Sequence, residues 1–253
     1  MTDPRTLLDL TGRVACVTGA SSGLGRRAAT VLAAAGARVI GVARRRDALK
    51  DWHEKTGAAA AIVIADLSDR SALAEIAATI AAPFGSPDIL VNAAGINTRQ
   101  AADEVTAEGW DTTLALNLTA PFFLSQALVP AMKTKGWGRI VNFASLQTTR
   151  AFPGGIAYGT TKAGIGQLTR AMAQAWSHDG INANAIGPGF FPTELTEPVF
   201  ADPERAAQNA DQTCIGRNGQ LEDLDGPLLF LCSDASAYVT GQILMVDGGF
   251  TAK

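Results

Sequence analysis

The chain has 253 residues, of which 47% are hydrophobic and 18% charged, and its formal net charge is −3. This length and apolar content suit one globular domain, and without a basic stripe neither a nucleic acid nor a membrane is expected as a partner. The three cysteines, Cys16, Cys214 and Cys232, are odd in number and far apart. This pattern excludes a disulfide framework and a cysteine metal site, so a reducing, cytoplasmic location without a bound metal is expected.

Short apolar runs rich in β-branched residues alternate with helix-forming segments along the chain. The segments expected as strands are 13–18, 38–43, 59–65, 88–92, 138–145, 181–186 and 242–246. The segments expected as helices are 26–35, 69–82 with Ser68 as its N-cap, about 106–133, 155–177 and 221–233. Strands that alternate with helices form a parallel sheet covered on both faces. The sequence therefore predicts an α/β fold with a doubly wound parallel sheet of about seven strands, in one domain spanning residues 1–253.

Two segments depart from this alternation. Residues 112–132 carry no charge, but Asn117 and Pro121 interrupt the apolar run, so a buried helix is expected there and not a membrane span. Residues 188–218 form a long irregular stretch, and such stretches in compact domains are usually functional. Aromatic residues such as Phe190 predict that this stretch is a lid with an apolar underside.

The first expected strand enters a glycine-rich turn, and this turn opens the first expected helix. Its sequence is Thr18-Gly-Ala-Ser-Ser-Gly-Leu-Gly25. Glycines permit a tight turn and let the backbone approach a pyrophosphate, which rests on the helix N-terminus. Because a second strand follows the helix, the whole unit is βαβ, and it predicts a bound dinucleotide.

The end of the second expected strand indicates which dinucleotide binds. An NAD site usually has an acidic residue there for the ribose 2′-hydroxyl, but this chain has Ala43 followed by Arg44 and Arg45. Arg44 can donate charge-assisted hydrogen bonds to a 2′-phosphate, with Arg45 as a helper. The sequence therefore favours NADP(H) over NAD(H).

Tyr158 lies four residues before Lys162 in a segment expected to be helical. Residues at this spacing are neighbours on one face of a helix. A nearby ammonium favours the phenolate, so Lys162 is expected to lower the pKa of Tyr158 from its usual value of about 10. A tyrosine shifted in this way can exchange a proton with a substrate oxygen.

Taken in order, the motifs resemble those of the short-chain dehydrogenase/reductase family over nearly the whole chain. The matching elements are the glycine turn, Asp66-Leu67, Asn92-Ala-Ala-Gly95, Asn117, Ser145, Tyr158 with Lys162, and Pro188-Gly189. The resemblance implies a Rossmann fold. It also implies an NADP-dependent oxidoreductase that moves hydride between the cofactor and the carbonyl or alcohol group of a small molecule.

The resemblance further implies a role for each matched residue. Tyr158 would be the general acid/base, and Ser145 would hydrogen-bond the substrate oxygen. Lys162 would contact the nicotinamide ribose, and Asn117 would hold a water that relays protons from Lys162. The residues expected to bind the cofactor are Gly19, Ser21, Ser22, Gly23, Leu24, Gly25, Arg44, Arg45, Asp66, Leu67, Asn92, Ala93, Gly95, Tyr158, Lys162, Pro188, Gly189 and Thr193.

The sequence says less about the substrate. The lid and the Ser145 loop look similar to the branch of the family that acts on sugar acids such as gluconate. Arg99 or Arg150 could hold a substrate carboxylate, and Gln147 could bond a hydroxyl. Phe190 and the other apolar lid residues would equally suit an apolar ketone.

Two other functions remain open at this point. A reductase of 3-oxoacyl thioesters belongs to the same family, but it would need a basic docking patch, which the sequence does not show clearly. A non-catalytic NADP-sensing protein would have no need of the set Asn117, Ser145, Tyr158 and Lys162. The family also implies a homotetramer, formed through the long helices that begin near Gly109 and Gly155 and through the C-terminal strand.

Overall fold

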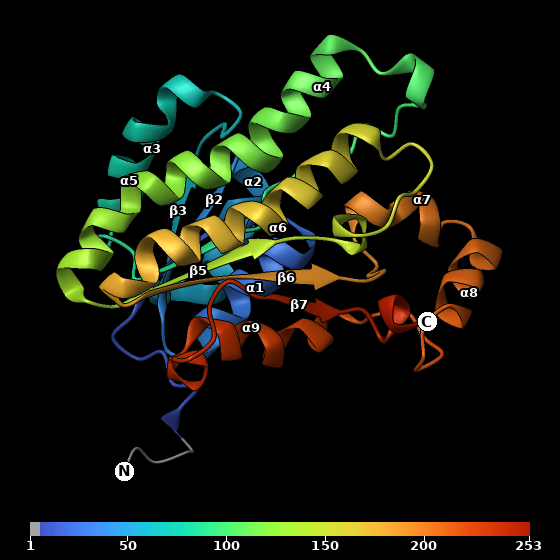
Figure 1. Ribbon diagram of the computed structural model, residues 1–253. Helices are drawn as coiled ribbons and strands as arrows, with labels where there is room; N and C mark the ends of the chain where they lie inside the picture. The colour runs from blue at the N-terminus through green and yellow to red at the C-terminus, as the bar shows by residue number, and fades with distance from the viewer. Residues whose placement is uncertain (1–5) are drawn as a thin grey trace.

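Seven parallel strands form the centre of the molecule, in the order β3-β2-β1-β4-β5-β6-β7 (Figure 1). The computed structural model describes residues 6–253. The strands are β1 (Val14–Thr18), β2 (Arg38–Ala43), β3 (Ala60–Ile64), β4 (Ile89–Asn92), β5 (Gly138–Phe143), β6 (Ile181–Pro188) and β7 (Ile243–Val246). The predicted doubly wound α/β sheet is confirmed.

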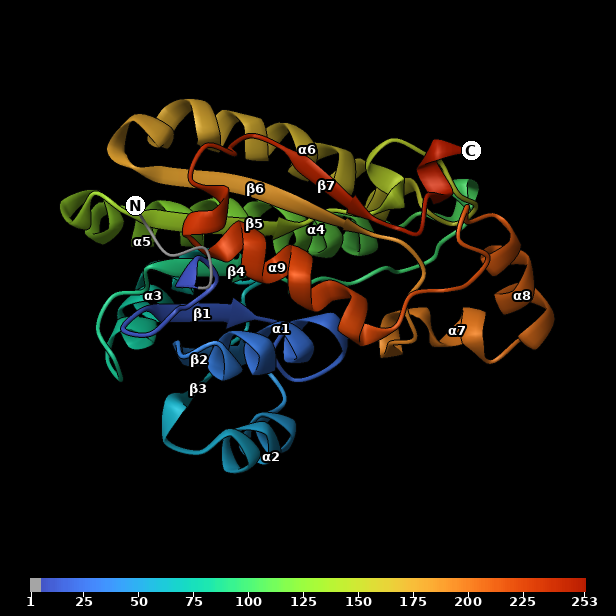
Figure 2. The same cartoon turned by 90° about the horizontal axis from the view of Figure 1, so that it is seen from below.

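Helices cover both faces of this sheet. One face carries α1 (Gly23–Ala34), α2 (Arg46–Thr56) and α9 (Asp225–Cys232). The other carries α3 (Leu73–Ala81), α4 (Ala107–Leu114), α5 (Ala120–Lys135) and α6 (Ile156–Trp176). Two short helices, α7 (Glu197–Phe200) and α8 (Pro203–Asp211), lie beyond the carboxyl ends of the strands (Figure 2).

Alternating side chains of each central strand fill two separate cores. In β1, Ala15 and Val17 pack with α1 and α9, whereas Val14 and Cys16 pack with α3 and α5. All five residues of β1 are buried, as expected for a strand covered on both faces. Burial of both faces explains why the strand segments read as continuous apolar runs.

The order of the strands reverses between β1 and β4. β1 pairs with β2 on one side and with β4 on the other, so successive connections run in opposite directions from this point. A crevice forms at the carboxyl ends of such strands. The Thr18 hydroxyl ties the two ends together, because it accepts hydrogen bonds from the backbone N–H groups of Ala93 (3.0 Å) and Ala94 (3.1 Å).

Several predicted boundaries shift for local reasons. The first helix begins at Gly23, inside the glycine turn, and not at Arg26. Ser68 does not cap the third helix; Asp69 does so for the 3-10 turn before α3, accepting a hydrogen bond from the backbone of Ser71. The fifth strand ends at Phe143, two residues before Ser145.

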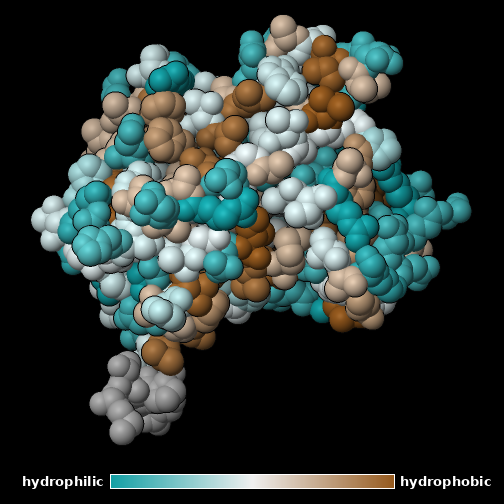
Figure 3. Space-filling model, viewed as in Figure 1, coloured by the Kyte–Doolittle hydropathy of each residue, from teal (hydrophilic) through white to brown (hydrophobic). Residues whose placement is uncertain are grey.

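The long uncharged helix is interrupted by a π-helical segment, Ala115–Thr119, between α4 and α5. By length and composition Ala107–Lys135 could cross a membrane, but 44% of its most apolar window is buried inside this fold. Figure 3, which shows this side of the molecule, has hydrophobic residues interspersed with hydrophilic ones. A core helix of a globular fold accounts for these features.

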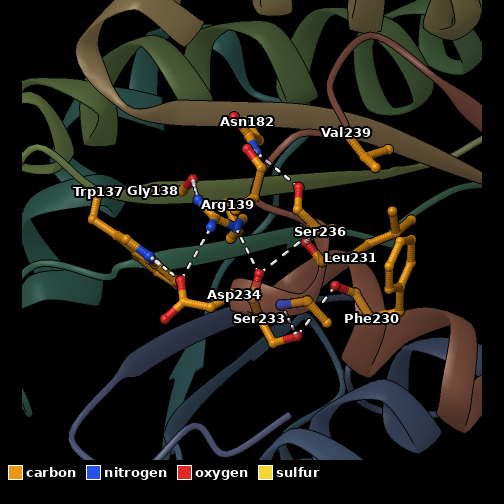
Figure 4. Close-up of polar contacts among 12 residues, drawn as sticks. Trp137, Gly138, Arg139, Asn182, Phe230, Leu231, Ser233, Asp234, Ser236 and Val239 are labelled. Atoms are coloured by element: carbon orange, nitrogen blue, oxygen red, sulfur yellow. Dashed lines mark hydrogen bonds and ion pairs between the residues drawn. The ribbon is translucent and has the colours of Figure 1, made fainter. Parts of the chain in front are cut away.

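A buried arginine fixes the amino end of the sheet to the end of α9 (Figure 4). Arg139 is 3% exposed and donates hydrogen bonds to the carbonyl oxygens of Ser233 (3.0 Å) and Gly138 (2.9 Å). Its guanidinium also lies 3.3 Å from Asp234, which accepts a hydrogen bond from the Trp137 indole. This cluster lies at the opposite end of the strands from the crevice, so we assign it a structural role.

Candidate active site

A cleft of about 670 Å³ opens at the carboxyl ends of the strands, between the glycine turn and the lid. Nearly all the site residues that the sequence predicts line this cleft. The exceptions are Asn92, Asn117 and Arg150. The cleft therefore brings together side chains that the chain places up to about 170 residues apart, from Gly19 to Thr193.

The glycine turn has the geometry of a dinucleotide cradle. Gly19 has a positive φ of 71°, and a Cβ there would lie 2.9 Å from the backbone of Ala94. A Cβ on Gly25 would collide with the carbonyl oxygen of Gly19. Ser22, the N-cap residue of α1, makes no side-chain capping bond, and the first turn of α1 holds no acidic residue. The helix N-terminus can therefore receive a pyrophosphate, and the residues present fit a dinucleotide.

Two arginines follow β2 and face different partners. Arg44 lies 3.5 Å from the carboxylate of Asp66. Arg45 donates to the Ser21 hydroxyl at 3.0 and 3.2 Å and forms an ion pair of 2.8 Å with Glu194 of the lid. The sequence favoured Arg44 as the main phosphate ligand with Arg45 as helper, but Arg45 makes the more extensive contacts with the glycine turn.

Asp66 and Leu67 lie together beside this end of the cleft. The Asp66 carboxylate accepts hydrogen bonds from the backbone (2.9 Å) and the hydroxyl (2.7 Å) of Ser68. The hydrogen bond from the Ser68 hydroxyl is the main reason that the pKa of Asp66 is lowered, and Arg44 adds to the effect. The carboxylate is therefore held ionised and fixed in direction, while Leu67 is buried beneath it.

Tyr158, Ser145 and Lys162 meet at the other end of the cleft. Tyr158 is in the first turn of α6, and Ser145 is close enough to its phenol to act on the pKa of the phenol. The Lys162 ammonium lies 5.5 Å from the centre of the Tyr158 ring, so the two side chains share one side of the helix as predicted. Ser145 is held in an extended conformation by a reciprocal capping arrangement with Thr148.

The prediction that Lys162 lowers the pKa of Tyr158 does not hold in this structure. Burial raises the pKa of the phenol, and the opposing effects come from the Ser145 hydrogen bond and the positive charge of Arg99. Lys162 instead donates a 2.6 Å hydrogen bond to the carbonyl oxygen of Phe143. Burial lowers the pKa of its own amine to about 8.

Asn117 lies in the π-helical segment and is 1% exposed. Its side chain exchanges two hydrogen bonds with the backbone of Ile96, of 2.8 and 2.9 Å, and donates a third to Thr161. Thr161 in turn donates to the carbonyl oxygen of Tyr158. Asn117 thus positions the loop after β4 and the first turn of α6, although it does not line the cleft. π-Helical insertions are frequent at functional sites.

Asn92 supports the cleft from within the core. Its amide donates a 2.9 Å hydrogen bond to Asn142, which donates to Thr169. The side chain is 4% exposed and lies beneath the cleft wall formed by Ala93 and Gly95. The side chain of Asn92 therefore lies in the core, and the expected contribution of this segment to the cofactor cleft would come from the backbone of residues 92–95.

The candidate substrate residues divide into two groups. Arg99, Gln147 and Phe190 line the cleft near Tyr158. Arg99 adopts a positive φ of 52° and donates a 2.6 Å hydrogen bond to the carbonyl oxygen of Leu195 in the lid. The amide oxygen of Gln147 lies over the start of α6, where a Cβ on Gly155 would collide with it.

Arg150 does not reach the cleft. It donates a 2.7 Å hydrogen bond to the main-chain oxygen of Lys253 and lies 6.0 Å from the ring centre of Phe250. Phe250 packs against Phe152 and Phe190 with ring centres about 6 Å apart. This position connects the Ser145 loop to the C-terminal segment, so Arg150 is not a candidate for holding a substrate carboxylate.

Sequence reasoning missed several residues that line the cleft. They include Ile96, Asn97, Phe152, Glu194 and Arg205. Most of them belong to the loop after β4 or to the lid, where no periodic pattern marks the side chains that face inward. Glu194 could have been noticed as an acidic residue next to Thr193, but nothing local to it predicts its pairing with Arg45.

The comparisons with known proteins agree with this geometry. Residues 19–251 match a family model described as Enoyl-(Acyl carrier protein) reductase. A gluconate 5-dehydrogenase of Gluconobacter oxydans (strain 621H) is 40% identical over 250 residues, which cover 98% of each chain. A 3-oxoacyl-[acyl-carrier-protein] reductase of Escherichia coli (strain K12) is 35% identical over 242 residues, covering 96% of this chain and 98% of that protein.

A solved structure shows the same agreement in three dimensions. The crystal structure of a gluconate 5-dehydrogenase from Burkholderia cenocepacia J2315 in complex with NADP and tartrate matches with a TM-score of 0.92. It is 33% identical, and the match covers 98% of both chains.

Proposed function

Since the chain belongs to the short-chain dehydrogenase/reductase family of oxidoreductases, we propose that it interconverts a small keto sugar acid and its alcohol with NADP(H). The observation that carries this proposal is the meeting of Tyr158, Ser145 and Arg99 at one end of a cleft whose other end fits a dinucleotide. Tyr158, as the proton donor, and Arg99, as the cation, line the same end of the cleft and could contact one small substrate.

The residues of this chain would divide the work of carbonyl reduction as follows. Bound NADPH supplies the hydride. Tyr158 donates a proton to the substrate oxygen, and Ser145 shares the negative charge that develops on that oxygen. Lys162, with a pKa of about 8, can then return a proton towards the phenol. Oxidation of the alcohol runs through the same groups in reverse.

The charge of the cleft favours anionic ligands. Five cationic side chains line it, against two carboxylates, although the whole chain carries a formal net charge of −3. The cations are Arg44, Arg45, Arg99, Lys162 and Arg205, and the carboxylates are Asp66 and Glu194. A cleft lined by one sign of charge concentrates ligands of the opposite sign. Arg45 with Ser21 and Ser22 would hold the 2′-phosphate, and Arg99 the sugar-acid carboxylate.

The related Burkholderia structure, with NADP and tartrate, supports these two classes of ligand, because tartrate is a small hydroxy acid. The 35% identical 3-oxoacyl-[acyl-carrier-protein] reductase keeps thioester reduction as the second candidate. The greater similarity to a gluconate 5-dehydrogenase favours the sugar acid. The alternative of a non-catalytic NADP sensor loses its support, because these relatives are named as dehydrogenases and reductases.

A panel of substrates tests the proposal. NADPH oxidation is measured with 5-ketogluconate, a neutral keto sugar, a 3-oxoacyl thioester and an aryl ketone. The keto acid should give the highest kcat/KM, and Arg99→Met should raise KM for the keto acid by about tenfold or more while sparing the neutral sugar. A preference for the thioester, or equal effects of Arg99→Met on both sugars, would contradict the assignment.

The enzyme would act in the cytoplasm as a homotetramer. Apolar residues exposed on this chain support burial against further copies, among them Ile156, Tyr238 and Leu244. Light scattering of the purified protein should give four times the chain mass of 26.2 kDa. A monomeric mass would exclude this assembly.

A further inference from the structure

The lid places a carboxylate on the arginine that faces the glycine turn. Glu194 is the first residue of the 3-10 turn Glu194–Thr196, and its two carboxylate oxygens lie 2.9 and 2.8 Å from one terminal nitrogen of Arg45. The remaining nitrogens of Arg45 donate to Ser21 and Ser22. One guanidinium therefore joins the turn to a lid residue 149 positions later in the chain.

The position of Glu194 is set by the lid backbone. Thr193, the residue before it, lies against the turn, with its side chain 3.2 Å from where a Cβ on Gly23 would stand. Thr193 also caps the 3-10 turn through a reciprocal arrangement with Thr196. On the other side, Arg99 holds the carbonyl oxygen of Leu195. Glu194 is thus presented to Arg45 by a segment anchored on both sides.

The pKa of Glu194 agrees with a specific ion pair between Glu194 and Arg45. The pKa of Glu194 is lowered, first by the hydrogen bond from Arg45 and also by one from Ser22. A carboxylate and a phosphate are the same kind of acceptor for a guanidinium, which can bind either of them with two parallel hydrogen bonds. Two anions at one guanidinium would repel each other.

We propose that Glu194 is a specificity-determining residue that competes with the 2′-phosphate of NADP(H) for Arg45. This inference rests on the proposed function, in which Arg45, Ser21 and Ser22 hold that phosphate. NADP(H) must displace the Glu194 carboxylate from Arg45 when its 2′-phosphate binds. NAD(H) has an uncharged hydroxyl at this position and leaves the ion pair intact. The lid thus reduces the advantage of NADP(H) over NAD(H) that Arg45 provides.

Isothermal titration of the purified protein with NADP+ and NAD+ tests this competition. Arg45 and Glu194 have side chains 50% and 63% exposed, so removing the pair should change binding by about fivefold at most. Glu194→Gln should lower the Kd for NADP+ by about that factor and leave the Kd for NAD+ within about twofold. The fragments 2′,5′-ADP and 5′-AMP should show the same contrast, because they carry the phosphate difference without the nicotinamide.

The matched control is Glu197→Gln, which removes a lid carboxylate that forms no ion pair within residues 6–253 and does not line the cleft. It should change neither Kd. In a second background, Arg45→Ala, the Glu194→Gln change should no longer affect NADP+ binding, since the shared partner is gone.

Two outcomes would overturn the competition. Equal tightening of NADP+ and NAD+ by Glu194→Gln would show a general effect of lid charge, and weaker NADP+ binding would show that Glu194 supports the bound cofactor. If the proposed function itself were wrong, a different result would be seen. The wild-type protein would not bind NADP+ more tightly than NAD+, and Arg45→Ala would weaken the binding of neither cofactor.

Discussion

The side chains around Tyr158 show how much a single residue depends on contacts that are distant in sequence. The spacing to Lys162 correctly predicts two neighbours on one helix face. The direction of the lysine amine, however, is set by the Phe143 carbonyl on β5, and a cation from another loop, Arg99, acts on the phenol. The surroundings of Tyr158, the proposed proton donor, are therefore set by three elements of the fold, and only one of them is its own helix.

Replacing Tyr158 by phenylalanine removes the proposed proton donor and keeps the ring. We expect kcat for carbonyl reduction to fall by about 10²- to 10⁴-fold, while the Kd for NADP+ stays within about twofold. Tyr238→Phe is the matched control, because Tyr238 is the only other tyrosine of the chain and does not line the cleft. Steady-state kinetics and titration of both variants check this, and a Tyr158→Phe enzyme with normal turnover would exclude Tyr158 as the acid.

At the scale of elements, the strands were easier to predict than the ends of the helices. Strands buried on both faces must be apolar throughout, so their positions appear directly in the sequence. The start of α1 inside the glycine turn and the π-helical segment around Asn117 depend on packing, because each meets a neighbouring loop. The cap at Asp69, in place of the predicted Ser68, is instead local, because its carboxylate accepts hydrogen bonds from Ser71.

The cluster around Arg139 gives a prediction at this scale. Arg139→Met should leave the carbonyl oxygens of Ser233 and Gly138 buried without their donor, at a cost of about 2–4 kcal/mol in the free energy of unfolding. Because the cluster lies at the amino end of the sheet, the Kd for NADP+ should not change.

Urea unfolding and titration provide the two measurements for this variant. Arg170→Met, at an exposed arginine of α6, is the control and should be close to neutral. A wild-type stability for Arg139→Met would show that the cluster does not hold α9 in place.

The whole molecule determines the cleft, because the strand order reverses between β1 and β4. The Thr18 hydroxyl at the end of β1 accepts hydrogen bonds from the backbone that follows β4. Within the expected lid, residues 188–218, Glu194 pairs with Arg45 and the carbonyl oxygen of Leu195 accepts a hydrogen bond from Arg99. Burial within the fold also lowers the pKa of Lys162.

That shift predicts how stability depends on pH. Between pH 8 and the usual lysine value of 10.5, the unfolded chain keeps a proton that folded Lys162 has released, so folding becomes more favourable as pH rises. Below pH 8 both states are protonated, and the full cost of burying the ammonium is present. Lys162→Met removes this dependence.

The stability of Lys162→Met relative to wild type should therefore be greatest near pH 7 and decline as pH rises from 8 to 10.5. Thermal unfolding of both proteins across this range measures the difference. The raised pKa values of Cys232 and Tyr158 make stability fall at high pH, but they are common to both proteins and cancel. A difference that does not change with pH would show that the Lys162 amine is not shifted by burial.

The sequence by itself determined the α/β alternation, the glycine turn and the pairing of Tyr158 with Lys162, because each leaves a local pattern of apolar runs or fixed spacing, and the family resemblance added Ser145. Only the tertiary structure decided that Arg150 turns to the C-terminal segment, that Arg45 contacts the glycine turn more than Arg44 does, and that Glu194 reaches it from the lid. These contacts join residues 103, 24 and 149 positions apart. The direction of a long charged side chain follows from the partners that the fold brings near it, and nothing in the adjacent sequence encodes those partners.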